Sequence, residues 1–231
     1  MRAIAQSSTM TRLRARFSVS MPIELIIFDV DGVLKQVVDP YMLLHRHFGT
    51  EEEGRRHFRA FREGHITYEE FAQLDAWAWR GRRVTEVKAL LRSTPYTRGA
   101  FETAAALHAR GIPFVFLSSG FDLNVEDVAR DLSAAGWCAN LLHQDHGRIV
   151  GRMTVQVPYG GKGPIVQEIL SRWDVDPGQV VAVGDSETDI RMFERVGHAV
   201  AIRPRTDVVR QAADITMGDL TEFITFIDSR M

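Results

Sequence analysis

A short apolar segment that ends in two aspartates constrains the fold of this chain more than any other feature. Residues 23–34 read IELIIFDVDGVL, so apolar side chains run almost unbroken up to Asp29 and Asp31. This pattern is typical of a buried parallel strand that reaches the edge of its sheet. Open α/β sheets bind their ligands beyond the carboxyl ends of the strands, which is where the two acids would lie.

If the two carboxylates lie side by side, their electrostatic repulsion must be offset. At a separation of about 4 Å and an effective dielectric constant near 20, they repel each other by roughly 4 kcal/mol. Either a cation bridges them or one of them holds a proton. Taken alone, the segment fits an ordinary strand with an acidic turn equally well, so further support must come from the rest of the chain.

Composition excludes several classes of protein. The chain has 231 residues, enough for one good-sized domain or for a core domain that carries a smaller inserted one. Its hydrophobic fraction of 45% and charged fraction of 25% are those of a soluble globular protein. A formal net charge of −2 argues against binding to nucleic acid or a membrane surface. Cys138 is the one cysteine, so no internal disulfide forms and we expect a cytoplasmic protein. The sequence has no apolar run of about 18 residues, the length needed to span a membrane. We expect a monomer or homodimer.

The first 20 residues differ from the rest. Four arginines occur among serines and threonines without any acid, a composition found in transit peptides. A disordered leader or an upstream start is the interpretation we favour for residues 1–20, with Met21 as a plausible first residue of the folded part.

Residues 37–95 are predicted to form a helical insertion, and residues 21–36 and 96–231 an α/β core. Apolar residues such as Phe58, Phe61 and Phe71 recur at helical spacing, and Thr67 is followed by acids as at a helix start. Trp77 and Trp79 are two residues apart, so we expect one to face the core and the other to face outward.

The remainder of the chain alternates between strands and helices. We expect strands at 113–117, 180–183 and 199–202, and a β-hairpin over 139–157. Helices are expected at 99–110, 124–135, 164–172, 190–196 and 206–213, before a C-terminal tail around 220–227. His143 and His146 flank the hairpin turn and fit surface residues better than metal ligands.

Polar residues follow each of three predicted strands. The strands end in Asp29 and Asp31, in Ser118, and in the segment GDSETD at 184–189, while Lys162 opens a helix after a glycine-rich loop. Parallel strands with right-handed crossovers bring all these ends to one edge of the sheet. We therefore expect one site there.

Four motifs resemble those of the haloacid dehalogenase superfamily of phosphatases. They are FDVDGV at 28–33, LSSG at 117–120, GKG at 161–163 and GDSETD at 184–189. The resemblance runs from about Ile23 to the C-terminal region, and the segments at 64–70 and 119–121 are similar to the phosphoserine phosphatase-like branch. It implies a doubly wound parallel sheet with an inserted helical cap.

The resemblance implies a Mg²⁺-dependent phosphomonoesterase that acts on a small phosphorylated metabolite. Asp29 would be the nucleophile and Asp31 the general acid and base, while Ser118 and Lys162 would stabilise the phosphoryl group. Mg²⁺ would be held by Asp29, the backbone carbonyl of Asp31, and Asp185, and Asp189 would anchor the outer shell of the metal or Lys162.

The expected substrate contacts are Ser119, Gly120, Thr188 and Asp75, and two of the surrounding positions depart from the pattern of the branch. Val38 stands where phosphoserine phosphatases have a glutamate, and Asp75 where they have an arginine for the substrate carboxylate. We therefore predict that phosphoserine is a poor substrate. A phosphomutase or phosphotransferase with the same intermediate, and a catalytically idle binding protein, are the alternatives.

Overall fold

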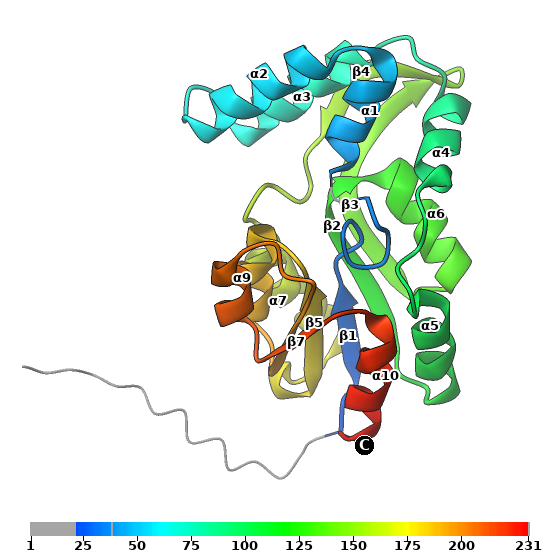
Figure 1. Ribbon diagram of the computed structural model, residues 1–231, viewed down its shortest axis with the longest axis vertical. Coiled ribbons are helices and arrows are strands. Elements are labelled where there is room, and N and C mark those ends of the chain that lie inside the picture. The colour runs from blue at the N-terminus through cyan, green and yellow to red at the C-terminus, as the bar shows by residue number, and fades with distance from the viewer. Residues whose placement is uncertain (1–21, 38, 231) are drawn as a thin grey trace, which may run out of the picture.

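The computed structural model describes residues 22–37 and 39–230, and its backbone is shown in Figure 1. The interpretation of residues 1–20 as a leader and the role of Val38 fall outside the described residues, so both stay predictions. None of the described helices is both long enough and apolar enough to cross a membrane.

A single sheet of seven strands forms the core, in the order β4-β3-β2-β1-β5-β6-β7. All neighbours pair in parallel except β4, which is antiparallel to β3. The predicted doubly wound parallel sheet is confirmed. The strands are β1 (Leu25–Phe28), β2 (Phe114–Phe121), β3 (Gly136–Asp145), β4 (Arg148–Thr154), β5 (Val180–Gly184), β6 (His198–Ile202) and β7 (Ile215–Met217).

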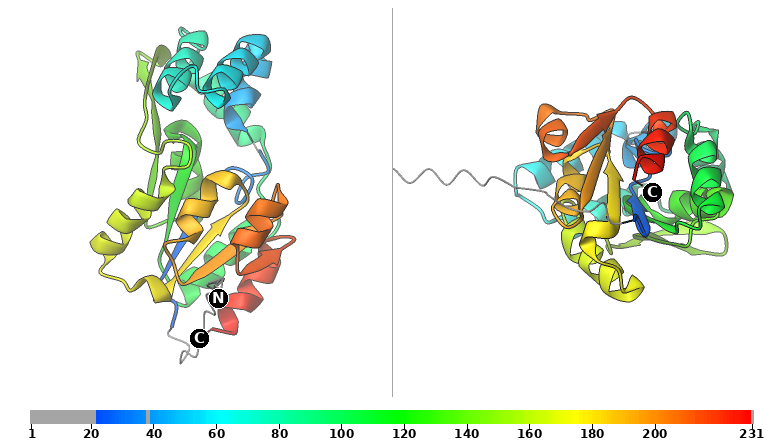
Figure 2. Two further views of the ribbon diagram at one scale, coloured as in Figure 1. Left: turned by 90° about the vertical axis from the view of Figure 1, so that its left-hand side faces the viewer. Right: turned by 90° about the horizontal axis from the view of Figure 1, so that it is seen from below.

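Helices cover both faces of the sheet, which explains why β1 is apolar at every position. Ile26 and Phe28 face one hydrophobic core, and Leu25 and Ile27 face the other. The first face carries α5 (Ala100–Ala109), α6 (Asp122–Leu132) and α10 (Leu220–Asp228); the second carries α7 (Lys162–Trp173), α8 (Ile190–Phe193) and α9 (Asp207–Ala212). Seen from below in Figure 2, the green and red helices lie on one side of the sheet and the yellow and orange ones on the other.

Four helices between β1 and β2 form the cap that lies above the core in Figure 1. They are α1 (Pro40–Phe48), α2 (Glu51–Arg62), α3 (Tyr68–Ala78) and α4 (Val84–Ser93). Helix α3 begins as expected, because the Thr67 hydroxyl accepts from the Glu70 amide while the Glu70 carboxylate accepts from the Thr67 amide. The β3–β4 hairpin rises to the cap, and Leu142, Ile149 and Met153 join its hydrophobic core.

Several local predictions were incomplete. Strand β2 continues through Ser118 to Phe121 instead of ending at residue 117, with an irregular register against β3 after Leu117. Strand β7 was not predicted, and the expected tail is the helix α10, whose Phe223 is fully buried against Phe28. The tryptophans separate as expected, since Trp79 is fully buried and Trp77 is exposed.

Candidate active site

The carboxyl ends of β1, β2 and β5 meet beneath the cap. Within the sheet, β2 and β3 lie on one side of β1, and β5, β6 and β7 lie on its other side. Strand β1 therefore lies at the point where the strand order reverses, which is the usual ligand position in such sheets. A cavity of about 210 Å³ opens there between core and cap, and Asp29, Asp31 and Ser118 line it.

Lys162 joins two of the predicted acids. Its Nζ lies 2.9 Å from Asp29 Oδ1 and 2.6 Å from Asp189 Oδ1, and the whole side chain is buried. Burial alone would lower the pKa of Lys162, but Asp189 and Asp29 together raise it above its ordinary value. The lysine therefore stays protonated and supplies a fixed positive charge beside Asp29.

Asp31 lies in a tight hydrogen-bonded setting. Its Oδ1 accepts a hydrogen bond of 2.8 Å from the side-chain amide of Asn124, and its Oδ2 accepts one of 3.2 Å from the Ser118 hydroxyl. Burial, and next the charge of Asp29, raise the pKa of Asp31 to about 7. Burial also raises the pKa of Asp29, to about 6, although Lys162 opposes it. A carboxyl group with a pKa near neutrality can both give and take a proton, as general acid–base catalysis requires.

The irregular end of β2 supplies polar groups close to Asp31. The Gly120 amide donates to the Ser118 hydroxyl at 2.9 Å, and the Ser119 carbonyl accepts from the side chains of Tyr41, Tyr68 and Asn140. The Ser119 hydroxyl lines the cavity, and although it is buried it has no hydrogen-bond partner. It is therefore available to a bound molecule.

The turn after β5 is organised by Asp189. Its Oδ2 accepts from the amides of Asp185 and Ser186, both at 2.9 Å, while its Oδ1 pairs with Lys162. Both oxygens are thus engaged, and this geometry favours the anchoring role for Asp189 over direct coordination of a metal.

Asp185 has a different arrangement. Its Oδ2 pairs with Arg205 Nε at 2.6 Å, but its Oδ1 is buried without a hydrogen-bond partner. Burial, followed by the charges of Asp189 and Asp29, raises the pKa of Asp185 to about 8. A buried oxygen without a hydrogen bond, among acids of raised pKa, is well suited to bind a cation.

The donor set fits Mg²⁺. Carboxylate oxygens of Asp29, Asp185 and Asp189 all lie within 4.8 Å of one another, and no nitrogen or sulfur ligand is among them. Hard divalent cations prefer such oxygen ligands, and Mg²⁺ needs only one or two carboxylates because it keeps several waters. Asp29 and Asp185 are the two that fit direct coordination best.

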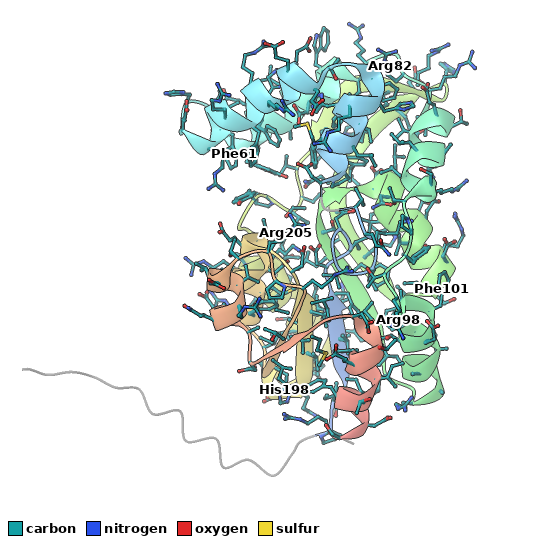
Figure 3. All side chains as sticks on the ribbon, in the orientation of Figure 1. Phe61, Arg82, Arg98, Phe101, His198 and Arg205 are labelled. Carbon is teal, nitrogen blue, oxygen red and sulfur yellow. The ribbon has the colours of Figure 1, made fainter. Side chains whose placement is uncertain are left out.

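Two residues of the site were missed by the sequence analysis. Asn124 lies in the first turn of α6, three residues after Phe121, the last residue of β2. Arg205 follows β6, and in Figure 3 it lies at the upper edge of the core, on the side that faces the cap. Both come just after parallel strands, so the rule that located Asp29 and Asp185 could have located them too.

The other two expected substrate contacts lie on different sides of the cavity. Thr188 lines its core side, with its hydroxyl 2.8 Å from that of Ser186. Asp75 lines its cap side but is only 1% exposed, and it pairs with His57 and His45. The carboxylate of Asp75 is thus held within the cap.

Comparison with known proteins identifies relatives along most of the chain. The family model described as haloacid dehalogenase-like hydrolase matches residues 26–194. A phosphoserine phosphatase of Methanocaldococcus jannaschii is 30% identical over 210 residues, which cover 88% of this chain and 97% of that protein. A phosphoserine phosphatase of Wolinella succinogenes is 26% identical over 207 residues, covering 88% of this chain and all of the relative.

Solved structures are similar as well. One described as a phospho-aspartyl intermediate analogue of phosphoserine phosphatase superposes with a TM-score of 0.76 at 27% identity, covering 89% of this chain and 99% of that one. The similarity extends through core and cap alike.

Proposed function

This chain belongs to the haloacid dehalogenase-like hydrolase family and is a phosphatase, and on that basis we propose that it is a Mg²⁺-dependent phosphomonoesterase that works through an aspartyl-phosphate on Asp29. One observation carries the proposal. A carboxylate held by a buried lysine, Asp29, lies next to a second carboxyl, Asp31, whose pKa is raised to about 7. The first suits a nucleophile and the second an acid–base group.

The reaction divides into two steps. In the first, a carboxylate oxygen of Asp29 attacks phosphorus, the bond from phosphorus to the ester oxygen breaks, and Asp31 protonates the departing oxygen. In the second, Asp31 takes a proton from water while the water oxygen attacks phosphorus, which releases inorganic phosphate and restores Asp29. The hydrogen bonds from Asn124 and Ser118 hold Asp31 in place for both transfers.

Mg²⁺ bound by Asp29, Asp185 and the backbone carbonyl of Asp31 would offset the charge that develops on the phosphoryl oxygens. Lys162 stabilises the same negative charge from the other side of Asp29. Asp189 keeps Lys162 in position, since it accepts from the lysine at 2.6 Å. Arg205 fixes Asp185 through one oxygen and leaves the other for the metal.

We further propose that the substrate is a small phosphate ester without a free carboxylate. The relatives are named phosphoserine phosphatases, but an amino acid phosphate needs a cation for its carboxylate. Among the described residues that line the cavity, Arg205 is the only lysine or arginine, and it pairs with Asp185. The cap instead contributes aromatic walls, which include Tyr41, Phe58 and Phe71. Such walls suit an apolar group on the ester.

Removal of each acid tests the mechanism. Asp29→Asn keeps the shape of the side chain but removes the attacking charge, so kcat should fall by several orders of magnitude in a folded protein. Asp31→Asn should cost about 10²- to 10⁴-fold, and less for an ester with a good leaving group. Phosphate release from aryl esters of graded leaving-group pKa measures both, and near-normal turnover by a folded Asp29→Asn protein would sink the mechanism.

A comparison of substrates tests the proposed specificity. With Mg²⁺ as the only divalent ion, kcat/KM for phosphoserine should lie at least about tenfold below that of an ester of similar size without a carboxylate. The reason is that Arg205, the one arginine or lysine among the described lining residues, pairs with Asp185. A sugar phosphate and a phosphorylated amino alcohol serve as comparison substrates. A clear preference for phosphoserine would show that the cap has been misinterpreted.

A further inference from the structure

Three side chains of metal-ligand type meet inside the cap, apart from the catalytic acids. They come from three different helices: His45 from α1, His57 from α2 and Asp75 from α3. Asp75 Oδ1 lies 2.8 Å from His57 Nδ1 and 3.1 Å from His45 Nε2, and all three ligand atoms lie within 4.8 Å of one another. The proposed reaction uses none of them.

One atom of this cluster makes no hydrogen bond, although it lies at ion-pair distance from Asp75. His45 is completely buried, and its Nδ1 lies 2.7 Å from the Thr50 hydroxyl. Its Nε2 points into the cluster but has no hydrogen-bond partner, although Asp75 is close. A buried polar atom without a hydrogen bond is unfavourable, so its retention calls for an explanation.

The chain makes room for the His45 ring. Gly54 lies inside helix α2, where glycine is less favourable than alanine. A Cβ atom at Gly54 would lie 2.4 Å from His45 Cδ2, so any larger residue would displace the imidazole. The helix therefore gives up stability at a position that keeps His45 next to Asp75.

We propose that His45, His57 and Asp75 bind a divalent transition metal of the Zn²⁺ class. Two imidazole nitrogens and one carboxylate favour such an ion over Mg²⁺, which prefers oxygen ligands. The contact from Thr50 to the far nitrogen of His45 is the kind of outer contact that orients a ligating histidine. The site is separate from the catalytic acids and does not depend on the proposed reaction.

The position of the cluster would bring the proposed metal close to the substrate. Three protein ligands leave a coordination position open, as in catalytic zinc sites. His45 and Asp75 line the cap side of the substrate cavity, so an ion bound to them would lie beside the bound ester. The ion would accept water or an oxygen atom of the substrate there.

A Co²⁺ titration followed by visible absorption tests the site without any assay of activity. The protein is kept in excess Mg²⁺, which occupies the catalytic acids, and Zn²⁺ is then added as competitor. The wild-type protein should bind one equivalent of Co²⁺ with the strong absorption bands of a four- or five-coordinate site, and Zn²⁺ should abolish them. His57→Gln and Asp75→Asn should each weaken Co²⁺ binding at least about 100-fold.

The matched control is His47→Gln, which removes an exposed histidine two residues from His45 on the same helix and should bind Co²⁺ like the wild type. Circular dichroism establishes that each variant is folded. The wild-type titration decides the question even if a variant does not fold, because absence of the absorption bands would overturn the proposal. Equal binding by folded His57→Gln and His47→Gln proteins would overturn it too. Neither result would affect the phosphatase assignment.

Discussion

At the scale of single residues, the site depends on how closely the backbone of β2 approaches the carboxylate of Asp31. Gly120 is the clearest case, because a Cβ atom there would lie 2.4 Å from Asp31 Oδ2 and 3.0 Å from Ser118 Oγ. Its backbone is not in the left-handed region, so the requirement for glycine comes from the space beside Asp31 and not from a turn. The position tolerates no side chain while Asp31 keeps its place.

Gly120→Ala should therefore lower kcat/KM about 100-fold, because a displacement of about 1 Å in a catalytic group has an effect of that size. Gly136→Ala on the neighbouring strand is the matched control, since its Cβ would meet only Val115 Cγ1 at 3.8 Å. Steady-state kinetics on both proteins measure the difference. Equal activities would mean that Asp31 can shift without cost.

At the scale of elements, the β3–β4 hairpin and the loop after it connect the cap to the catalytic strands. Asn140 on β3 donates to the Ser119 carbonyl and accepts from the amides of Gln156 and Val157 at 2.9 and 2.8 Å. In the same loop, Tyr159 packs its ring against those of Phe61 and Tyr68 in the cap. The lower edge of the cap is thus held by aromatic contacts.

Replacing Tyr159 separates the ring from the hydroxyl. Tyr159→Ala loses two aromatic pairs, each worth about 0.5–1.5 kcal/mol, so KM should rise roughly tenfold or more as the cap docks less firmly. Tyr159→Phe loses only the exposed hydrogen bond from Arg62 and should stay within about threefold of wild type. If both variants show the same rise in KM, the hydroxyl and not the ring holds the cap.

At the scale of the whole molecule, the site gathers several buried carboxyl groups at the carboxyl ends of the central strands. Burial makes their charged forms unfavourable. Burial is the largest cause that raises the pKa of Asp29 to about 6, of Asp31 to about 7 and of Asp185 to about 8, from an ordinary value of 3.8. The folded, metal-free protein thus binds these protons more tightly than the unfolded chain does. These three protonated acids contribute to the free energy of unfolding. Their contribution is fully present below pH 3.8 and is lost as the pH rises through about 6 to 8.

Mg²⁺ should reverse this loss, because it replaces the protons. The rise in Tm on adding Mg²⁺ to metal-free protein should be larger at pH 8 than at pH 5, where protons compete for the same oxygens. Thermal unfolding at the two pH values measures the difference, and Asp185→Asn should remove most of the Mg²⁺ response. A rise in Tm of equal size at both pH values would contradict the assignment of these acids to the metal.

The sequence alone determined where the acids of the candidate site lie, because each is tied to a local pattern. An apolar run followed by Asp29 or Asp185 marks a strand end, and parallel connections bring such ends to one edge whatever the details of packing. Ser118 lies near the same edge, although β2 continues past it to Phe121. The helical insertion followed from periodicity in the same way, since four helices occupy the chain between β1 and β2.

Only the tertiary structure decided which groups meet these acids and what lines the cap. Arg205 reaches the backbone carbonyl of Asp31 from 174 positions away, and Asn124 reaches the Asp31 carboxylate from 93 positions away. Asp75 stands in the sequence as an isolated acid, yet packing of three helices encloses it with His45 and His57. Contacts of this kind depend on how separate elements pack side by side, and no local periodicity carries that information.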